Sequence, residues 1–350
     1  MSSLALAAAP SGAAHPHHPW RRAARASWVV HRTTFLVLGA LFVALAAGIV
    51  VRGLSVHRDY TQFMAKGCLG HATTKGCPQL LAAVGSEESF LSNMAVLLHL
   101  VPLVAGVFIG APLISREIES SSFRFTWTQG MGRLRFELRR YLLLTGSIVV
   151  IAVVLGLLIG WLAHPIERVG LTSHWDATLF DTTPLVLPAW AFFSMAAGTL
   201  IGLAVGRTVS AMAMTAVPVG GLLAFGAIPR FGGTPGLIGR VLQLGPPVAR
   251  SKHYLPAQPW NEPSQGVGFG PRGSWLVRSW VTTPRGRVLS PTQAFVLLGH
   301  HRAQLQHYRF WYSYQPADRY WTFEAIFALA LVIVGALFVV ALVQLLRRHG

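Results

Sequence analysis

Long apolar stretches dominate the pattern of hydrophobic and polar positions along this chain. A helix that crosses a bilayer needs about 20 mostly apolar residues. Only Gly206, Arg207 and Thr208 separate two of these stretches, which predicts a tight helical hairpin. In all, the pattern predicts six transmembrane helices: Thr34–Val51, Met94–Leu113, Tyr141–Leu162, Pro184–Val205, Val209–Ile228 and Thr322–Leu346.

The positions of the basic residues predict the orientation of these helices. Short cytoplasmic loops of membrane proteins carry an excess of Lys and Arg, whereas long loops cross the membrane largely regardless of charge. With six helices, one side of the membrane receives most of the arginines of the termini and short loops, so we assign both termini and that side to the cytoplasm. The arginines concerned are Arg21, Arg22, Arg25, Arg32, Arg116, Arg124, Arg133, Arg135, Arg139, Arg140, Arg207, Arg347 and Arg348.

The expected fold is therefore an all-α polytopic membrane protein with a large outer loop between helices five and six. Within that loop, Ser290 and Pro291 suit an N-cap and a first helical position, which predicts a helix running toward Tyr308 and into the last span. Aromatic residues around that junction predict an interfacial belt: Tyr308, Phe310, Trp311, Tyr312, Tyr320, Trp321 and Phe323. The expected divisions are an N-terminal region 1–33, helices one to five in 34–228, the outer loop 229–321 and the last helix with the C-terminal end 322–350.

Composition excludes several protein classes. Hydrophobic residues make up 53% of the chain and charged residues only 12%, against about 25% charged in soluble domains. The formal net charge of +17 at first suggests nucleic-acid binding. A mean hydropathy of +0.50 argues instead that basic residues decorate the membrane ends, so no nucleic-acid partner is expected.

Cys68 and Cys77 are the only cysteines, and both fall in the first outer loop. Disulfides persist outside the cell, so we predict that the two are bonded, with a pair of free thiols as the alternative.

Small residues recur at four-residue spacing in three of the predicted helices. Such stripes let helix backbones approach closely, and they indicate either an interface that slides or static packing. The candidates are Gly106, Gly110, Gly156, Gly160, Gly198, Gly202 and Gly206, together with Ser194.

Ionisable residues are nearly absent from the predicted spans. His99 has no apparent carboxylate partner and is interpreted as a hydrogen-bonded packing residue, while Glu324 lies near the outer end of the last span. A proton-driven carrier usually needs a buried relay, so the energy for transport is expected from elsewhere. The chain contains no P-loop pattern, and neither catalytic residues nor a metal site are predicted.

The cytoplasmic stretch from Ser115 to Arg133 carries both charge signs together with Phe123, Phe125 and Trp127. Aromatic residues and paired charges favour a docking surface for a cytoplasmic partner. The alternative is an amphipathic segment on the inner leaflet.

At this point the chain resembles the membrane subunits of type-2 ABC exporters. The resemblance rests on Gly110–Glu119 (GAPLISREIE), on Phe125–Gln129 (FTWTQ) and on Arg133, with Ser121 and Ser122 where Gly-Thr is usual. The run Tyr314–Trp321 into the last span is also similar to the family.

The resemblance implies a permease subunit of the bacterial plasma membrane that pairs with a second permease copy, identical or different, to form a pore. Two ABC ATPase subunits would dock beneath, and ATP and Mg would belong to them, with no cofactor in this chain. Trp20–Arg32 resembles the family's elbow helix on membrane lipids. The residues expected to contact the ATPase are Glu117, Glu119, Arg124, Trp127, Gln129 and Arg133.

Two other functional classes remain open. A stand-alone channel or secondary transporter would need no ATPase, and a membrane-embedded enzyme would need a clustered outer site. The sequence does not identify the substrate.

Overall fold

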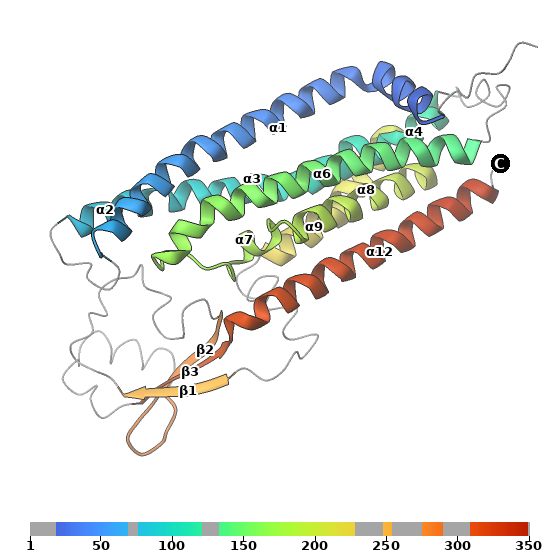
Figure 1. Ribbon diagram of the computed structural model, residues 1–350. Coiled ribbons are helices and arrows are strands. Elements are labelled where there is room, and N and C mark those ends of the chain that lie inside the picture. The colour runs from blue at the N-terminus through green and yellow to red at the C-terminus, as the bar shows by residue number, and fades with distance from the viewer. Residues whose placement is uncertain are drawn as a thin grey trace, which may run out of the picture.

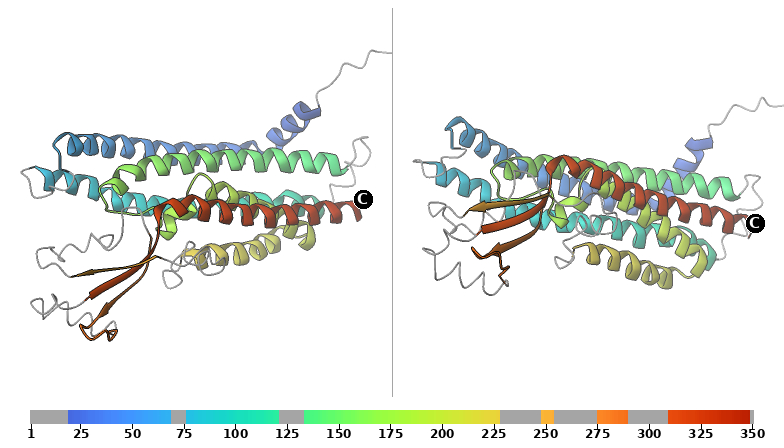
Figure 2. Two further views of the ribbon diagram at one scale, coloured as in Figure 1. Left: turned by 60° about the horizontal axis from the view of Figure 1, so that its bottom comes forward. Right: turned by 90° about the horizontal axis from the view of Figure 1, so that it is seen from below.

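The computed structural model describes residues 19–68, 76–120, 133–227, 248–253, 275–289 and 309–348. Long helices lie side by side in these regions, and a small sheet lies beyond one end of the bundle (Figure 1). The N-terminal end of α12 adjoins the sheet, while its C-terminal end lies at the opposite end of the bundle (Figures 1 and 2). The helices are α1 (Pro19–Ala65), α2 (Cys77–Ser86), α3 (Glu88–Val104), the π-helix η1 (Ala105–Gly110), α4 (Ala111–Glu119), α6 (Arg133–Arg168), α7 (Ala177–Asp181), α8 (Val186–Val205), α9 (Thr208–Ala227), the 3₁₀ helix η5 (Ala317–Arg319) and α12 (Tyr320–Arg348).

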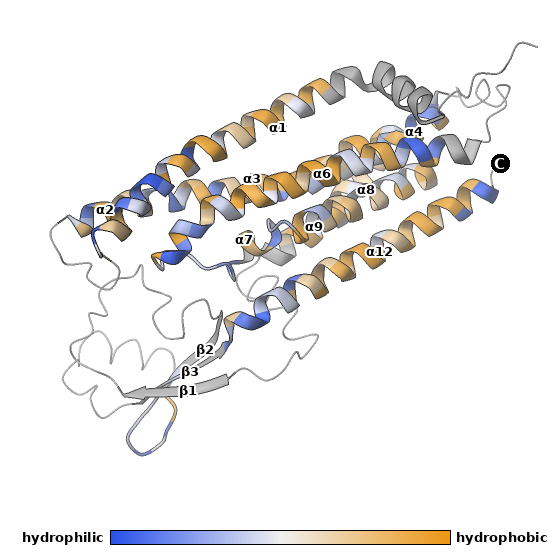
Figure 3. Ribbon diagram, viewed as in Figure 1, coloured by the Kyte–Doolittle hydropathy of each residue, from blue (hydrophilic) through white to orange (hydrophobic). Residues whose placement is uncertain are grey.

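Five helical stretches of the described chain are long and apolar enough to cross a membrane: Gly39–Ala65, Cys77–Glu119, Glu137–Arg168, Val186–Val205 and Ala317–Arg348. The fifth predicted span corresponds to α9, whose described apolar part, Thr208–Ala224, is shorter. Hydrophobic residues dominate the middle of these helices and hydrophilic ones gather near their ends (Figure 3). The molecule is thus a multi-pass membrane protein.

The first helix continues well past the predicted end of its span at Val51. Ile49, Val56 and Phe63 recur every seven residues and are almost fully buried, so one face of α1 continues along α6 and α2. Hydropathy predicts only where the apolar stretch ends. The helix itself continues, because neither a proline nor a pair of glycines follows Val51 to end it. The Trp20–Arg32 segment belongs to this same helix, and its first turns are angled away from the rest (Figure 2).

Helix α8 occupies the centre of the bundle. Fourteen of its residues are buried, and it packs against α12, η1, α4, α6 and α9. A helix that is apolar all round belongs in such a buried position. By contrast, α1 and α12 leave large apolar side chains exposed along their outer faces, among them Val37, Val51, Leu329 and Leu337.

A three-stranded antiparallel sheet occupies part of the region expected to be a helical or irregular loop. Its strands are β1 (Val248–His253), β2 (Trp275–Thr282) and β3 (Arg309–Gln315), in the order β1-β3-β2. The expected helix from Ser290 toward Tyr308 lies outside the described residues. The segment Arg309–Gln315, which η5 separates from α12, is nevertheless a strand, because its aromatic residues favour extended backbone. Trp280 and Trp311 are paired across the sheet and stack in parallel planes.

The expected aromatic belt is only partly present at the start of α12. Tyr320 and Phe323 point inward and pack edge-to-face against Trp175, and Phe180 joins the same cluster. Trp321 is the exposed member, with 62% of its surface accessible. Adjacent positions on a helix face different sides, so Tyr320 and Phe323 pack in the core while Trp321 is exposed.

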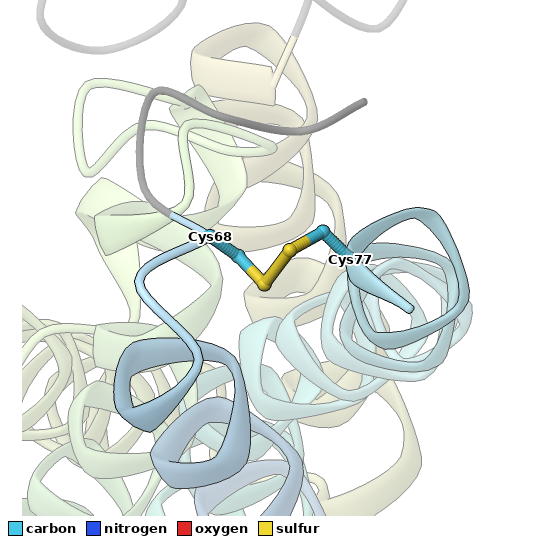
Figure 4. The surroundings of a disulfide bond; sticks show 2 residues. All are labelled: Cys68 and Cys77. Carbon is cyan, nitrogen blue, oxygen red and sulfur yellow. A yellow bond between two sulfur atoms is a disulfide. The ribbon is translucent and has the colours of Figure 1, made fainter. Parts of the chain in front are cut away.

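A disulfide bond joins Cys68 to Cys77 (Figure 4). The two Cα atoms are 5.5 Å apart, and both side chains are buried beside Phe63 at the junction of α1 and α2. The bond therefore holds the first two membrane helices together at one end of the bundle.

Replacing both cysteines by serine is expected to lower the free energy of unfolding by about 2–3 kcal/mol, because the bond closes a short loop. Thermal unfolding of the purified protein, with and without reductant, measures the effect. Reductant should destabilise the native protein and leave the Cys68→Ser/Cys77→Ser variant unchanged. Equal stability of the native protein under both conditions would contradict the prediction.

Candidate coupling site

Two of the residues expected to contact a partner, Glu117 and Glu119, lie in the last turn of α4. The start of α6, the turn between α8 and α9 and the C-terminal end of α12 lie at the same end of the bundle (Figure 1). The opposite end carries α2, α7 and the sheet.

Helix α4 is anchored by one apolar face. Leu113 and Ile114 are buried in the core, and Ser115, also buried, donates a hydrogen bond of 2.8 Å from its Oγ to the carbonyl oxygen of Ala111. The polar residues Glu117 and Glu119 follow in the last turn. The helix is therefore held in the bundle while its end reaches the surface.

Glu117 forms an ion pair with Arg140 of α6. The Arg140 side chain is 9% exposed and the Glu117 side chain 30%. Glu117 therefore ties α4 to α6, and much of its carboxylate is engaged inside the protein rather than presented to solvent.

Glu119 reaches the beginning of α9. Its Oε2 accepts a hydrogen bond of 2.9 Å from the backbone N–H of Thr208, the first residue of that helix. The first N–H groups of a helix lack partners within the helix and carry partial positive charge. The carboxylate thus satisfies one of these donors and links α4 to α9.

Ile118, between the two acids, contacts the turn that joins α8 to α9. Gly206 ends α8 with a positive φ of 66°, and a Cβ there would lie 3.3 Å from Cγ2 of Ile118. Only glycine adopts this conformation without cost. Three consecutive residues of α4 therefore touch α6, the α8–α9 turn and α9.

Four of the predicted glycines form a close backbone crossing between α8 and the η1–α4 segment. A Cβ at Gly106 would lie 2.7 Å from the carbonyl oxygen of Ser194, and one at Gly110 would lie 3.0 Å from that of Met195. A Cβ at Gly198 would collide with the carbonyl oxygen of Gly106, and one at Gly202 with that of Ala111. Direct backbone contact of this kind needs small residues.

The π-helix lies at this crossing. Pro102, which lacks a backbone N–H, precedes it inside α3, and Pro112 follows it at the start of α4. Such single-turn π segments often mark functional positions in helices. The close backbone contacts between α8 and the η1–α4 segment therefore occur where the helix departs from α-helical geometry.

The two glycines of α6 have different surroundings. A Cβ at Gly156 would lie 2.8 Å from Pro184, in the turn before α8. At Gly160 nothing in the described chain lies within 4 Å of that position, so the expected helix packing is absent there. Gly160 lines a pocket instead.

Part of the predicted contact set lies outside the described residues, namely Arg124, Trp127 and Gln129. Arg133 is the first residue of α6. Sequence reasoning missed Arg140 and Thr208 as partners of the two acids, because they lie 23 and 89 positions away. Arg140 had appeared only as one of many cytoplasmic arginines.

His99 has a carboxylate partner after all. Its Nε2 lies 3.1 Å from Oδ2 of Asp181, a buried residue at the end of α7, and its Nδ1 lies 3.3 Å from the carbonyl oxygen of Ala95. The expected hydrogen bonding of His99 is confirmed, but the expected lack of a carboxylate partner was wrong, because Asp181 falls in a connecting segment rather than in a predicted span.

Comparison with known protein families gives a match over the membrane region. A family model described as ABC-2 membrane transporter related matches residues 39–227, more than half of the chain. The matched region contains the α4 contacts and the glycine crossing. No curated protein and no solved structure matches the chain at a significant level.

Proposed function

Because the chain belongs to the ABC-2 membrane transporter related family, we propose that it is the membrane-spanning permease subunit of an ATP-driven ABC exporter. Two permease chains would form the pore, and a separate ABC ATPase would dock on the end that carries α4. The family match supports the permease assignment, and it extends the resemblance seen in Gly110–Glu119 to most of the membrane region.

The observation that carries the coupling proposal is the set of contacts made by Glu117, Ile118 and Glu119. A force applied to the segment after α4 would reach α6 through Arg140 and α9 through Thr208. The glycine crossing would pass the same displacement to α8, because backbones in direct contact cannot slide past each other without steric cost. The four helices would then tilt together and change the access of the pore.

The proposed orientation places this end in the cytoplasm and counts α9 as a span, so that six helices cross the membrane. Arg116, Arg139, Arg140, Arg207 and the C-terminal Arg347 and Arg348 lie at that end, in agreement with the positive-inside rule. The disulfide lies at the other end, where an oxidising compartment would preserve it. The membrane would be the plasma membrane of a bacterium.

The buried pair of His99 and Asp181 favours one second candidate, a proton-coupled carrier. Buried ionisable pairs within membrane proteins often serve as proton relays. Transport that persists without ATP and stops when the proton gradient collapses would favour the carrier.

Copurification tests the partnership. We expect the tagged full chain, purified in mild detergent, to bring with it a protein that has a P-loop, and the complex to hydrolyse ATP. Trp127→Ala should reduce the copurified ATPase at least tenfold, because Trp127 is one of the aromatic residues in the stretch from Ser115 to Arg133 that is proposed to dock on the ATPase. Trp321→Ala, the same change at the opposite end, should leave it unchanged. Equal amounts of ATPase with both variants would contradict the proposed docking end.

A further inference from the structure

A pocket of about 460 Å³ opens between α6 and α12, at the end of the bundle that carries the sheet. Its volume lies in the range of small-molecule sites. Residues of α6, of the start of α12 and of the segment between α7 and α8 line it. The established family membership assigns no role to it.

The lining combines apolar and aromatic side chains with acids. Glu167 and Glu324 are its carboxylates and His164 and His174 its histidines, with no Lys or Arg among the described residues that line it. In a chain with a formal charge of +17 and only 12 acidic residues, this pocket is a local concentration of negative charge.

Glu324 is the most unusual residue of the pocket. It is fully buried, and neither carboxyl oxygen has a hydrogen-bond partner of good geometry within the described residues. The Thr183 hydroxyl, the backbone N–H of Leu185 and the Tyr320 hydroxyl are the polar groups that face it. Burying a carboxylate is costly unless it is well hydrogen-bonded, so a bound cation would offset part of the cost of burying Glu324.

Glu167 and several aromatic residues also line the pocket. Glu167 lies at the wall with its Oε2 3.7 Å from Nδ1 of His174, and His174 packs edge-on against Tyr320. Trp161 and the exposed Trp321 also line the pocket. Aromatic faces attract organic cations, more strongly where water is excluded.

The geometry points to a binding site for a hydrophobic organic cation, such as a quaternary ammonium or phosphonium compound, in the pocket between α6 and α12. Glu324 and Glu167 balance its charge, and Tyr320, Trp321 and Trp161 contact its apolar groups. The formal net charge of +17 would not by itself predict a preference for cations. The site is defined by this chain alone and needs no ATPase.

Equilibrium dialysis of the purified full chain with tetraphenylphosphonium tests the proposal. Tetraphenylborate, which has nearly the same shape and the opposite charge, is the matched control ligand. We expect saturable binding of tetraphenylphosphonium and at least tenfold weaker binding of tetraphenylborate. Glu324→Gln should weaken tetraphenylphosphonium binding at least tenfold, whereas Glu88→Gln, which changes an exposed acid outside the pocket, should not.

A second variant keeps the test decisive if Glu324→Gln does not fold. Gly160 lines the pocket, and a Cβ added there would meet no described atom within 4 Å. A side chain at this position therefore starts in open space beside the pocket, so Gly160→Phe is expected to occupy the pocket with its ring and to abolish binding. Binding that is equal for both ions, or unaffected by Gly160→Phe, would overturn the proposal. Because the measurement requires no transport, its result is separate from that of the copurification.

Discussion

The double variant Gly198→Ala/Gly202→Ala is expected to lower the free energy of unfolding by about 2–4 kcal/mol. Each added methyl group would collide with a backbone carbonyl oxygen of the η1–α4 segment, and overpacking typically costs about 1–3 kcal/mol per site. The higher helix propensity of alanine offsets only about 1 kcal/mol of that cost at each position. Thermal unfolding of the detergent-solubilised protein measures the change.

A matched control exists within the same chain. Gly146 and Gly160 of α6 are exposed, and a Cβ at either position meets nothing within 4 Å. The variant Gly146→Ala/Gly160→Ala makes the identical chemical change and should cause no loss of stability. Equal destabilisation by both double variants would mean that the α8 crossing is not tightly packed.

Reversing the charge of Glu117 is expected to have the second large effect. In Glu117→Arg, the guanidinium of Arg140, whose side chain is 9% exposed, would face another cation. Breaking a buried ion pair on one side costs about 3–5 kcal/mol, and the partial exposure of Glu117 places the expected loss near the lower limit. ATP-dependent transport should fall with it, because α4 would no longer be tied to α6.

A variant with exchanged charges distinguishes the loss of the Glu117–Arg140 ion pair from the mere loss of a negative charge at position 117. Glu117→Arg/Arg140→Glu restores opposite charges across the same contact and should recover at least half of the lost stability, as read from a double-mutant cycle. Glu88→Arg, at an exposed position on α3, should have little effect. A swap no more stable than the single variants would show that the contact itself is unimportant.

The membrane helices were largely predictable because hydropathy is a local property. The spans expected at Pro184–Val205 and Thr322–Leu346 differ from α8 and α12 by at most two residues at either end. Where the prediction failed, a helix continued outside the apolar stretch, as in α1 beyond Val51. The three-stranded sheet was missed because its strands pair across long sequence separations.

The candidate site was predictable in part. Glu117 and Glu119 were identified from a family-like motif, and the family assignment is confirmed by the match to residues 39–227. Both carboxylates also contact other helices of the same chain, and their contact with an ATPase stays a prediction. A motif records which residues recur, but it does not say whether a carboxylate faces a partner protein or an internal arginine.

The amino-acid sequence by itself determined that this is a multi-pass helical membrane protein. It also identified the stretch from Ser115 to Arg133 as the candidate docking surface. These conclusions follow from apolar length, from the distribution of arginines and from a local motif. Only the tertiary structure decided that Glu117 meets Arg140, that His99 meets Asp181 and that Glu324 lies buried in an acidic pocket. Each of those contacts joins residues from different helices, whose spacing in space depends on how the whole bundle packs.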